Sequence, residues 1–176
     1  HLVEDVHDVA RVSPRQSEKL ALVTQTTLSV DDAAEITAAV QKRFPKVRRP
    51  KQQDICYATQ NRQDAVKLMS SEVDLVIVVG SATSSNSNRL AELAAKLGTP
   101  SHMVDSAEEL RPEWFDGCSR IGLTAGASAP EVLVQAVIER IRSLGAVSVR
   151  SMRAEPETIK FPLPKGLRLD GLDAQP

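Results

Sequence analysis

Aromatic side chains and cysteines are scarce in this chain of 176 residues. Aromatic residues make up 3% of the sequence and hydrophobic residues 41%, so a core would have to be built from Val, Leu, Ile and Ala. Such a core fits the layers of an α/β domain. The two cysteines, Cys56 and Cys118, are too few for a disulfide scaffold, so we expect a reducing, cytoplasmic setting.

A strong net charge and long apolar runs are also missing. The formal net charge of −1 gives no general attraction to nucleic acid or to an anionic membrane surface. No apolar run approaches the length of a membrane span, and no charged-then-apolar leader opens the sequence. We therefore expect neither nucleic acid nor a membrane as a partner. The first residue is His1 rather than Met, so we expect a processed product or a piece of a longer protein.

The most informative stretch is Asp74–Gly98. It begins with DLVIVVG, a nearly continuous apolar run typical of a strand buried on both faces, and ends with RLAELAAKLG, an amphipathic helix. The loop between them consists almost wholly of small hydroxyl and amide side chains. A helix N-terminus after such a loop favours an anion, and the absence of a GK[ST] ending excludes a nucleotide P-loop. The predicted phosphate donors are Ser84, Ser85 and Asn86.

The order of apolar runs and helix signals predicts the α/β class. Over residues 54–145 helices and strands alternate, which indicates a parallel sheet of βαβ units with helices on both faces. We expect one complete unit here, part of a second unit before it, and an extended tail after it. Other predicted elements are a buried strand at Leu20–Val23, a helix over about 30–44 capped by Ser29, a helix over about 61–71 with Asn61 as a possible cap, and a short helix over 107–115.

Four polar loops would meet at the carboxyl ends of the strands, where open α/β sheets bind ligands. Ser128 is predicted to cap the last helix, with Glu131 completing a capping box. The four loops are Thr24–Ser29, Cys56–Asn61, Ser81–Asn88 and Thr124–Ser128.

Each of these residues also has a purely structural explanation. Ser128 could be only a cap, Thr26 could bond its own backbone, and Cys56 could be a small buried hydrophobe. Ser84 and Ser85 could cap a helix too, but one helix start does not need so many donors. No neighbouring Glu or His presents itself as a general base.

Together the four loops resemble the hydroxymethylbutenyl diphosphate reductase family of isoprenoid biosynthesis, also called IspH or LytB. The likeness runs from the first residues to about Phe161. The matching motifs are TQTTLSVDD (24–32), DICYATQNRQ (54–63), VVGSATSSNSNRLAELA (78–94) and GLTAGASAPEVLVQ (122–135).

The resemblance implies an oxidoreductase of the MEP pathway. Its reaction is the reductive dehydroxylation of hydroxymethylbutenyl diphosphate to isopentenyl and dimethylallyl diphosphates. The family uses a 4Fe-4S cluster on three cysteines, and a ferredoxin- or flavodoxin-type protein donates the electrons. Cys56 matches the third cluster ligand, Thr26 a catalytic threonine that bonds the hydroxyl end of the substrate, and Thr59 a residue near the cluster. The residues that match diphosphate ligands are Ser84, Ser85, Asn86 and Ser128.

The family consists of three similar α/β units around a central cluster. On this pattern residues 1–53 are the latter part of the second unit, 54–145 the complete third unit, and 146–176 an extended C-terminal tail. The family's other two cysteines, its diphosphate-binding histidines and its proton donor match nothing in this chain. We therefore expect the polypeptide by itself to be inactive.

Two other functions remain open at this point. A phosphosugar-binding module of the sugar isomerase type shares the strand, the serine-rich loop and the helix, and needs no metal. It leaves Cys56, TQTT and TAGASAP unexplained. An interaction domain using the basic segment Lys42–Lys51 is the third interpretation, and only charge supports it.

Overall fold

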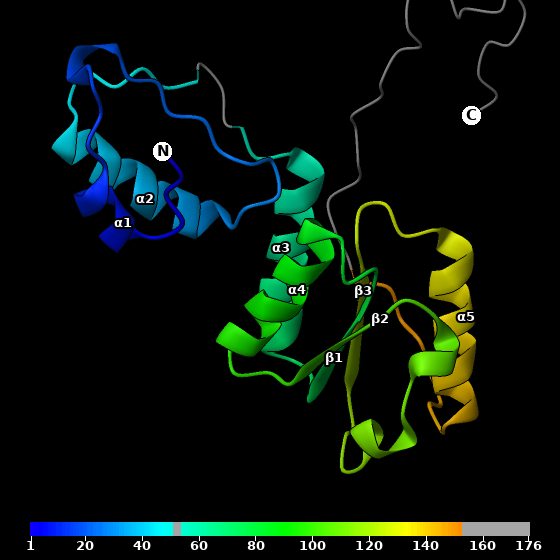
Figure 1. Cartoon of the computed structure of the whole chain (residues 1–176). Helices are drawn as coiled ribbons and strands as arrows, with labels where there is room; N and C mark the ends of the chain where they lie inside the picture. Colours follow the sequence, from blue (N-terminus) through cyan, green and yellow to red (C-terminus); the bar gives the residue numbers. More distant parts are fainter. Residues whose placement is uncertain (51–53, 153–176) are drawn as a thin grey trace, which may run out of the picture.

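The computed structural model describes residues 1–50 and 54–152, which include a three-stranded parallel sheet (Figure 1). The strands are β1 Leu75–Val79, β2 Ser101–Val104 and β3 Ile121–Ala125, in the order β2-β1-β3. All five residues of β1 are buried, as its continuous apolar run predicts. Its neighbours pair with it in parallel on both sides.

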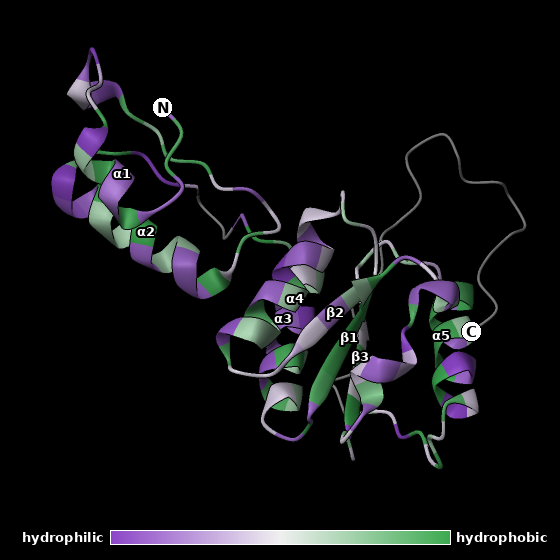
Figure 2. Ribbon diagram, turned by 60° about the horizontal axis from the view of Figure 1, so that its bottom comes forward, coloured by the Kyte–Doolittle hydropathy of each residue, from purple (hydrophilic) through white to green (hydrophobic). Residues whose placement is uncertain are grey.

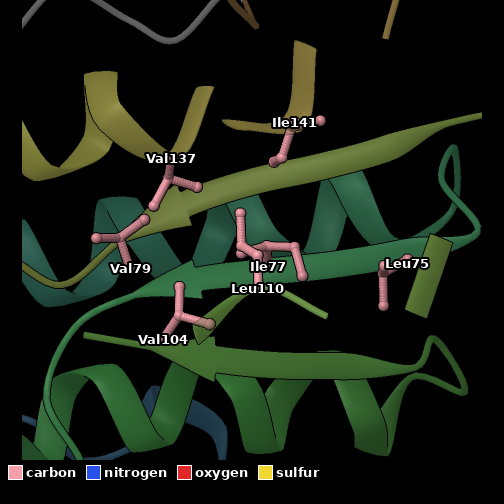
Figure 3. Close-up of a cluster of buried hydrophobic side chains, with 7 residues drawn as sticks. All are labelled: Leu75, Ile77, Val79, Val104, Leu110, Val137 and Ile141. Carbon is pink, nitrogen blue, oxygen red and sulfur yellow. The ribbon is translucent and has the colours of Figure 1, made fainter. Parts of the chain in front are cut away.

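Helices cover both faces of this sheet, which confirms the predicted α/β architecture (Figure 1). Side chains of β1 alternate between the two faces. Leu75, Ile77 and Val79 pack with Val137 and Ile141 of α5 (Figure 3). Val76 and Val78 on the other face join a cluster of α3 and α4 residues: Val66, Met69, Leu90 and Ala94.

Helices α1 and α2 pack on each other beside α3, away from the sheet (Figure 2). Ser29 caps α2 as predicted, because its Oγ accepts the N–H of Asp32 at 3.4 Å. The α-helices are α1 Val6–Arg11, α2 Val30–Arg43, α3 Tyr57–Ser70, α4 Ser85–Lys96 and α5 Glu131–Ser143, and the 3-10 turns are η1 Ser17–Lys19, η2 Ala107–Glu109 and η3 Pro112–Phe115.

The buried strand predicted at Leu20–Val23 is wrong. Ala21 forms a single parallel bridge with Arg48, and the side chain of Val23 is 80% exposed. A strand is stabilised by a ladder of hydrogen bonds and by layers on its faces. Among the described residues this segment has one rung of a ladder and no covering layer over Val23.

Three predicted helix starts are also wrong. Helix α4 begins at Ser85 with Ser84 as its N-cap, so Ser85–Asn88 are helical and not part of the predicted loop. Helix α3 begins at Tyr57 with Cys56 as its N-cap, four residues before Asn61, because the carbonyl of Cys56 already accepts the N–H groups of Thr59 and Gln60. Cys56–Asn61 is therefore the first turn of a helix and not a loop. Helix α5 begins at Glu131, and its N-cap is Pro130 rather than Ser128.

Proline explains both the later start of α5 and the broken helix at 107–115. A cap at Ser128 would put Ala129 in a helical conformation directly before Pro130, which proline disfavours sterically. The predicted helix over 107–115 is interrupted at Pro112 in the same way and forms η2 and η3. Of the predicted tail, residues 146–152 have no helix or strand, and residues 153–176 lie outside the described residues.

No helix in residues 1–50 and 54–152 is both long and apolar enough to cross a membrane.

Two valines on α5 allow a matched test of this packing. Val137 is 0% exposed against the sheet, whereas Val132 on the same helix is 72% exposed. We expect Val137→Ala to lower the free energy of unfolding by about 2 kcal/mol through lost burial and a cavity, and Val132→Ala to change it by less than about 0.5 kcal/mol. Urea unfolding measures both values. Equal losses would show that α5 does not pack as described.

Candidate functional site

Two polar loops start side by side at the carboxyl edge of the sheet. One joins β1 to α4 and the other joins β3 to α5. The N–H of Gly126, just after β3, donates to the carbonyl of Val79 at the end of β1 over 2.8 Å. This bond extends the strand pairing into the loops and fixes their starting points next to each other.

Ser87, in the first turn of α4, fills the space between the two loops. A Cβ at Gly80 or at Gly126 would lie 2.2 Å from the Oγ of Ser87, so neither loop has room for a side chain there. Ser87 is 1% exposed, and its hydroxyl donates to the Oγ of Ser84 at 3.1 Å. The glycines and Ser87 thus hold the loops in one interlocked arrangement. These three residues were not among the predicted site residues, although a glycine directly after the first and the third strand is visible in the sequence.

The N-terminus of α4 provides donors that have no acceptor in residues 1–50 and 54–152. Ser84 is the N-cap, and its Oγ accepts the N–H of Ser87 at 3.3 Å as well as the Ser87 hydroxyl. Since Ser84 Oγ accepts both bonds, its own proton is left to donate. Within the described part of the chain, the N–H groups of Ser85 and Asn86 have no acceptor either. A helix end with free N–H groups attracts negative charge.

Asn86 is the most unusual polar residue at this helix end. It is 6% exposed, and neither its Oδ1 nor its Nδ2 has a hydrogen-bond partner in residues 1–50 and 54–152. An unpaired buried polar group costs about 1–3 kcal/mol. A ligand that bonded this amide would remove that cost, and it could do so only after the atoms that cover the amide had shifted.

Ser128 lies in the exposed part of the loop between β3 and α5. Because Pro130 is the cap of α5, the hydroxyl of Ser128 is not used for capping. It has no hydrogen-bond partner in the described part of the chain. Ser85 on α4 is exposed as well, so both loops present hydroxyl groups to solvent.

Cys56 lies at the N-terminus of α3 with an exposed thiol. Its N–H donates to the carbonyl of Thr26 at 2.9 Å, which brings the TQTT segment beside the cysteine. The carboxylate of Asp54 holds the same segment by accepting the N–H and hydroxyl of Thr24 at 2.9 and 3.2 Å. Thr26 is exposed, whereas Thr59, one turn into α3, is only 2% exposed.

The described residues bring together one thiol and no complete metal site. No group of three or more His, Cys, Asp or Glu side chains within residues 1–50 and 54–152 could hold a metal ion. The second cysteine, Cys118, is half-buried, and its Sγ lies 3.6 Å from the carbonyl of Trp114. Cys56 is therefore the cysteine that is available to an outside group, as one ligand among others.

The fold and this edge define a class of protein: an α/β protein with hydroxyl- and amide-rich loops at the carboxyl edge of its sheet and an exposed cysteine at the N-terminus of α3. The chain belongs to the LytB protein family, whose model matches residues 1–142. This confirms the family resemblance that the four motifs carry.

Relatives and a solved structure agree with this assignment. The chain is 75% identical over 170 residues to a protein of Polaromonas sp. and 70% identical over 167 residues to one of Methylibium petroleiphilum, both named 4-hydroxy-3-methylbut-2-enyl diphosphate reductase. These matches cover 97% and 95% of the chain but 51% of each relative, so the chain spans about half their length. The structure of the Plasmodium falciparum E-1-hydroxy-2-methyl-but-2-enyl-4-diphosphate reductase matches with a TM-score of 0.73 at 36% identity, covering 79% of this chain and 44% of that one.

The contact between Ser87 and the two glycines predicts a specific double-variant result. We expect Gly126→Ala to lower the free energy of unfolding by about 1–3 kcal/mol through overpacking. Adding Ser87→Ala should relieve much of this loss, because the new Cβ would then meet Ser87 Cβ at 3.5 Å, an ordinary contact.

Gly80→Ala is the matched control. Its new Cβ would lie 2.7 Å from Ser87 Cβ as well, so Ser87→Ala should not relieve it. Urea unfolding of the single and double variants gives the two coupling energies. Similar coupling at both glycines would contradict the interlocked arrangement.

Proposed function

We propose that this chain is the part of a 4-hydroxy-3-methylbut-2-enyl diphosphate reductase that supplies one cluster ligand and much of the diphosphate site. The reaction is the two-electron reductive dehydroxylation of hydroxymethylbutenyl diphosphate to isopentenyl and dimethylallyl diphosphates, in the MEP pathway of isoprenoid biosynthesis. The observation that carries the proposal is that an exposed cysteine, and hydroxyl and amide donors without an acceptor in residues 1–50 and 54–152, lie at helix N-termini of one α/β unit. Its sequence is 75% identical to a relative that bears this enzyme's name.

Cys56 is the proposed ligand of a 4Fe-4S cluster. Its exposed thiol at a helix N-terminus suits one thiolate of such a site, and the other ligands come from outside the described residues. When bound, the cluster supplies electrons, received from a ferredoxin- or flavodoxin-type protein, and an iron that takes the substrate's hydroxyl group. With one thiolate of its own, this polypeptide alone is expected to be inactive.

The diphosphate group binds at the N-terminus of α4 and the loop before α5. Hydrogen bonds to a charged oxygen are about twice as strong as those between neutral groups, so a few neutral donors suffice. The N–H groups of Ser85 and Asn86, which have no acceptor among the described residues, the hydroxyl proton of Ser84 and the helix dipole all favour an anion at this place. Ser128 adds a hydroxyl from the second loop.

Thr26 is the proposed catalytic residue of this chain. Its exposed hydroxyl lies on a segment that is bonded to the backbone of Cys56, so it can hold the hydroxyl end of a substrate next to the cysteine's ligand position. It acts by orienting that hydroxyl group and donating or accepting its hydrogen bond. Thr59 remains a proposed neighbour of the cluster, one turn behind Cys56.

Iron and sulfide analysis of a full-length protein carrying this segment tests the cluster. After anaerobic reconstitution we expect Cys56→Ser to lose most of the bound iron and sulfide, because a hydroxyl is a poorer ligand than a thiolate. Cys118→Ser is the matched control and should retain both. If the full-length protein holds no cluster, or if Cys56→Ser keeps it in full, the reductase proposal fails.

Inorganic diphosphate tests the anion site without any turnover. We expect Asn86→Ala to weaken its binding about 10- to 100-fold in the same full-length protein, since one hydrogen bond to a charged group is worth about 1.5–3 kcal/mol. The control is Asn61→Ala, which changes an exposed asparagine on α3. Titration calorimetry gives both dissociation constants, and equal values for the two variants would exclude the side chain of Asn86 as a ligand.

A further inference from the structure

Helix α3 holds two loops of the site through two consecutive side chains. The first is Arg62, which lies between α3 and the end of β3. Its Nε donates to the carbonyl of Ala125 at 3.1 Å and its Nη1 to the carbonyl of Ala58 at 3.2 Å. Ala125 is the last residue of β3, so this contact fixes the start of the loop that carries Ser128.

The second side chain, Gln63, reaches the other loop. It is 2% exposed, and its Nε2 donates to the carbonyl of Leu28 at 3.0 Å. Leu28 lies two residues after Thr26 and directly before Ser29, the N-cap of α2. The bond therefore ties the TQTTLS segment to α3 through a side chain that is almost fully buried, where an unpaired amide is costly.

Both contacts start from the helix whose N-cap is Cys56. Consecutive residues of an α-helix point about 100° apart, so Arg62 and Gln63 reach elements on different sides of α3. The N–H of Cys56 adds a third bond, to the carbonyl of Thr26. One rigid helix thus links the cysteine to a loop on either side of it.

We propose that Arg62 and Gln63 are a pair of positioning residues that set the Ser128 loop and the Thr26 loop, respectively, at fixed places relative to Cys56. This inference rests on the proposed function, in which one loop binds the diphosphate and the other orients the hydroxyl end of the substrate. The two ends of the substrate are then held by separate contacts. Arg62 governs binding of the diphosphate end, and Gln63 governs the reacting end.

Two ion pairs between α2 and the helices of the sheet unit do not position the loops in this way. Lys67 pairs with Asp31 at 2.9 Å and Lys96 with Asp32 at 3.0 Å. These pairs are largely exposed, and exposed ion pairs contribute little. Arg62, in contrast, has no carboxylate partner in residues 1–50 and 54–152. It donates its hydrogen bonds to the backbone carbonyls of Ala58 and Ala125.

The experiment uses a full-length protein carrying this segment, with the variants Arg62→Gln and Gln63→Met. Amide hydrogen exchange of residues 24–29 and 125–130 is measured alongside kcat and KM. We expect Arg62→Gln to speed exchange only in 125–130 and to raise KM and the Kd for inorganic diphosphate about tenfold, with kcat nearly unchanged. We expect Gln63→Met to speed exchange only in 24–29 and to lower kcat about tenfold, with the Kd for diphosphate unchanged.

Three controls separate positioning from general loosening. Lys67→Met removes an ion pair on the same helix and should alter neither loop nor any constant. Arg62→Lys, which can still reach one carbonyl, should fall between wild type and Arg62→Gln. If Gln63→Met does not fold, Gln63→Asn replaces it. The same result is expected, because the asparagine side chain is too short to reach Leu28.

The outcomes distinguish the proposed positioning roles of Arg62 and Gln63 from the proposed function of the protein. If each variant loosens both loops, or if kcat and KM change together in both, the pairwise positioning is wrong. If the wild-type full-length protein reduces no substrate, the proposed function fails, while exchange and diphosphate binding still test whether each residue holds its own loop.

Discussion

The burial of β1 on both faces is the constraint on which the rest of the structure depends. Its residues alternate between α5 on one side and α3 with α4 on the other, so one five-residue strand orients three helices at once. Because its neighbours run parallel to it, their carboxyl ends share one edge. The loops that follow β1 and β3 therefore begin side by side at that edge.

Close packing also shapes the site itself. Ser87 occupies the space that a side chain at Gly80 or Gly126 would need, and its hydroxyl holds the capping serine of α4. The donors of the helix end are therefore presented by a rigid base rather than by a flexible loop. Preorganised donors bind an anion at a smaller cost in conformational freedom, which supports the anion-binding role proposed for this helix end.

The sequence predicted most of the sheet unit, for reasons that are local, and it pointed to the segments that form the candidate site. The short apolar run DLVIVVG indicates a doubly buried strand, and Ser29 and Ser84 carry helix-start signals within a few residues. The errors occurred where a local signal is overridden, either because distant pairing partners are missing or because an adjacent residue has a steric effect. Leu20–Val23 has the composition of a strand but only one ladder contact, and the steric effect of Pro130 on Ala129 overrides the cap at Ser128. The bond from Gln63 to Leu28 spans 35 residues, and no local pattern could indicate it.

The interlocking of Gly80, Ser87 and Gly126 has a consequence for how such a sequence can change over time. A larger side chain at either glycine is blocked while Ser87 keeps its hydroxyl, and at Gly80 even an alanine in place of Ser87 leaves too little room. A side chain larger than hydrogen at either glycine is therefore penalised, and at position 126 the penalty is relieved once Ser87 changes as well. The three positions depend on one another, although the first two lie seven positions apart and the last two 39.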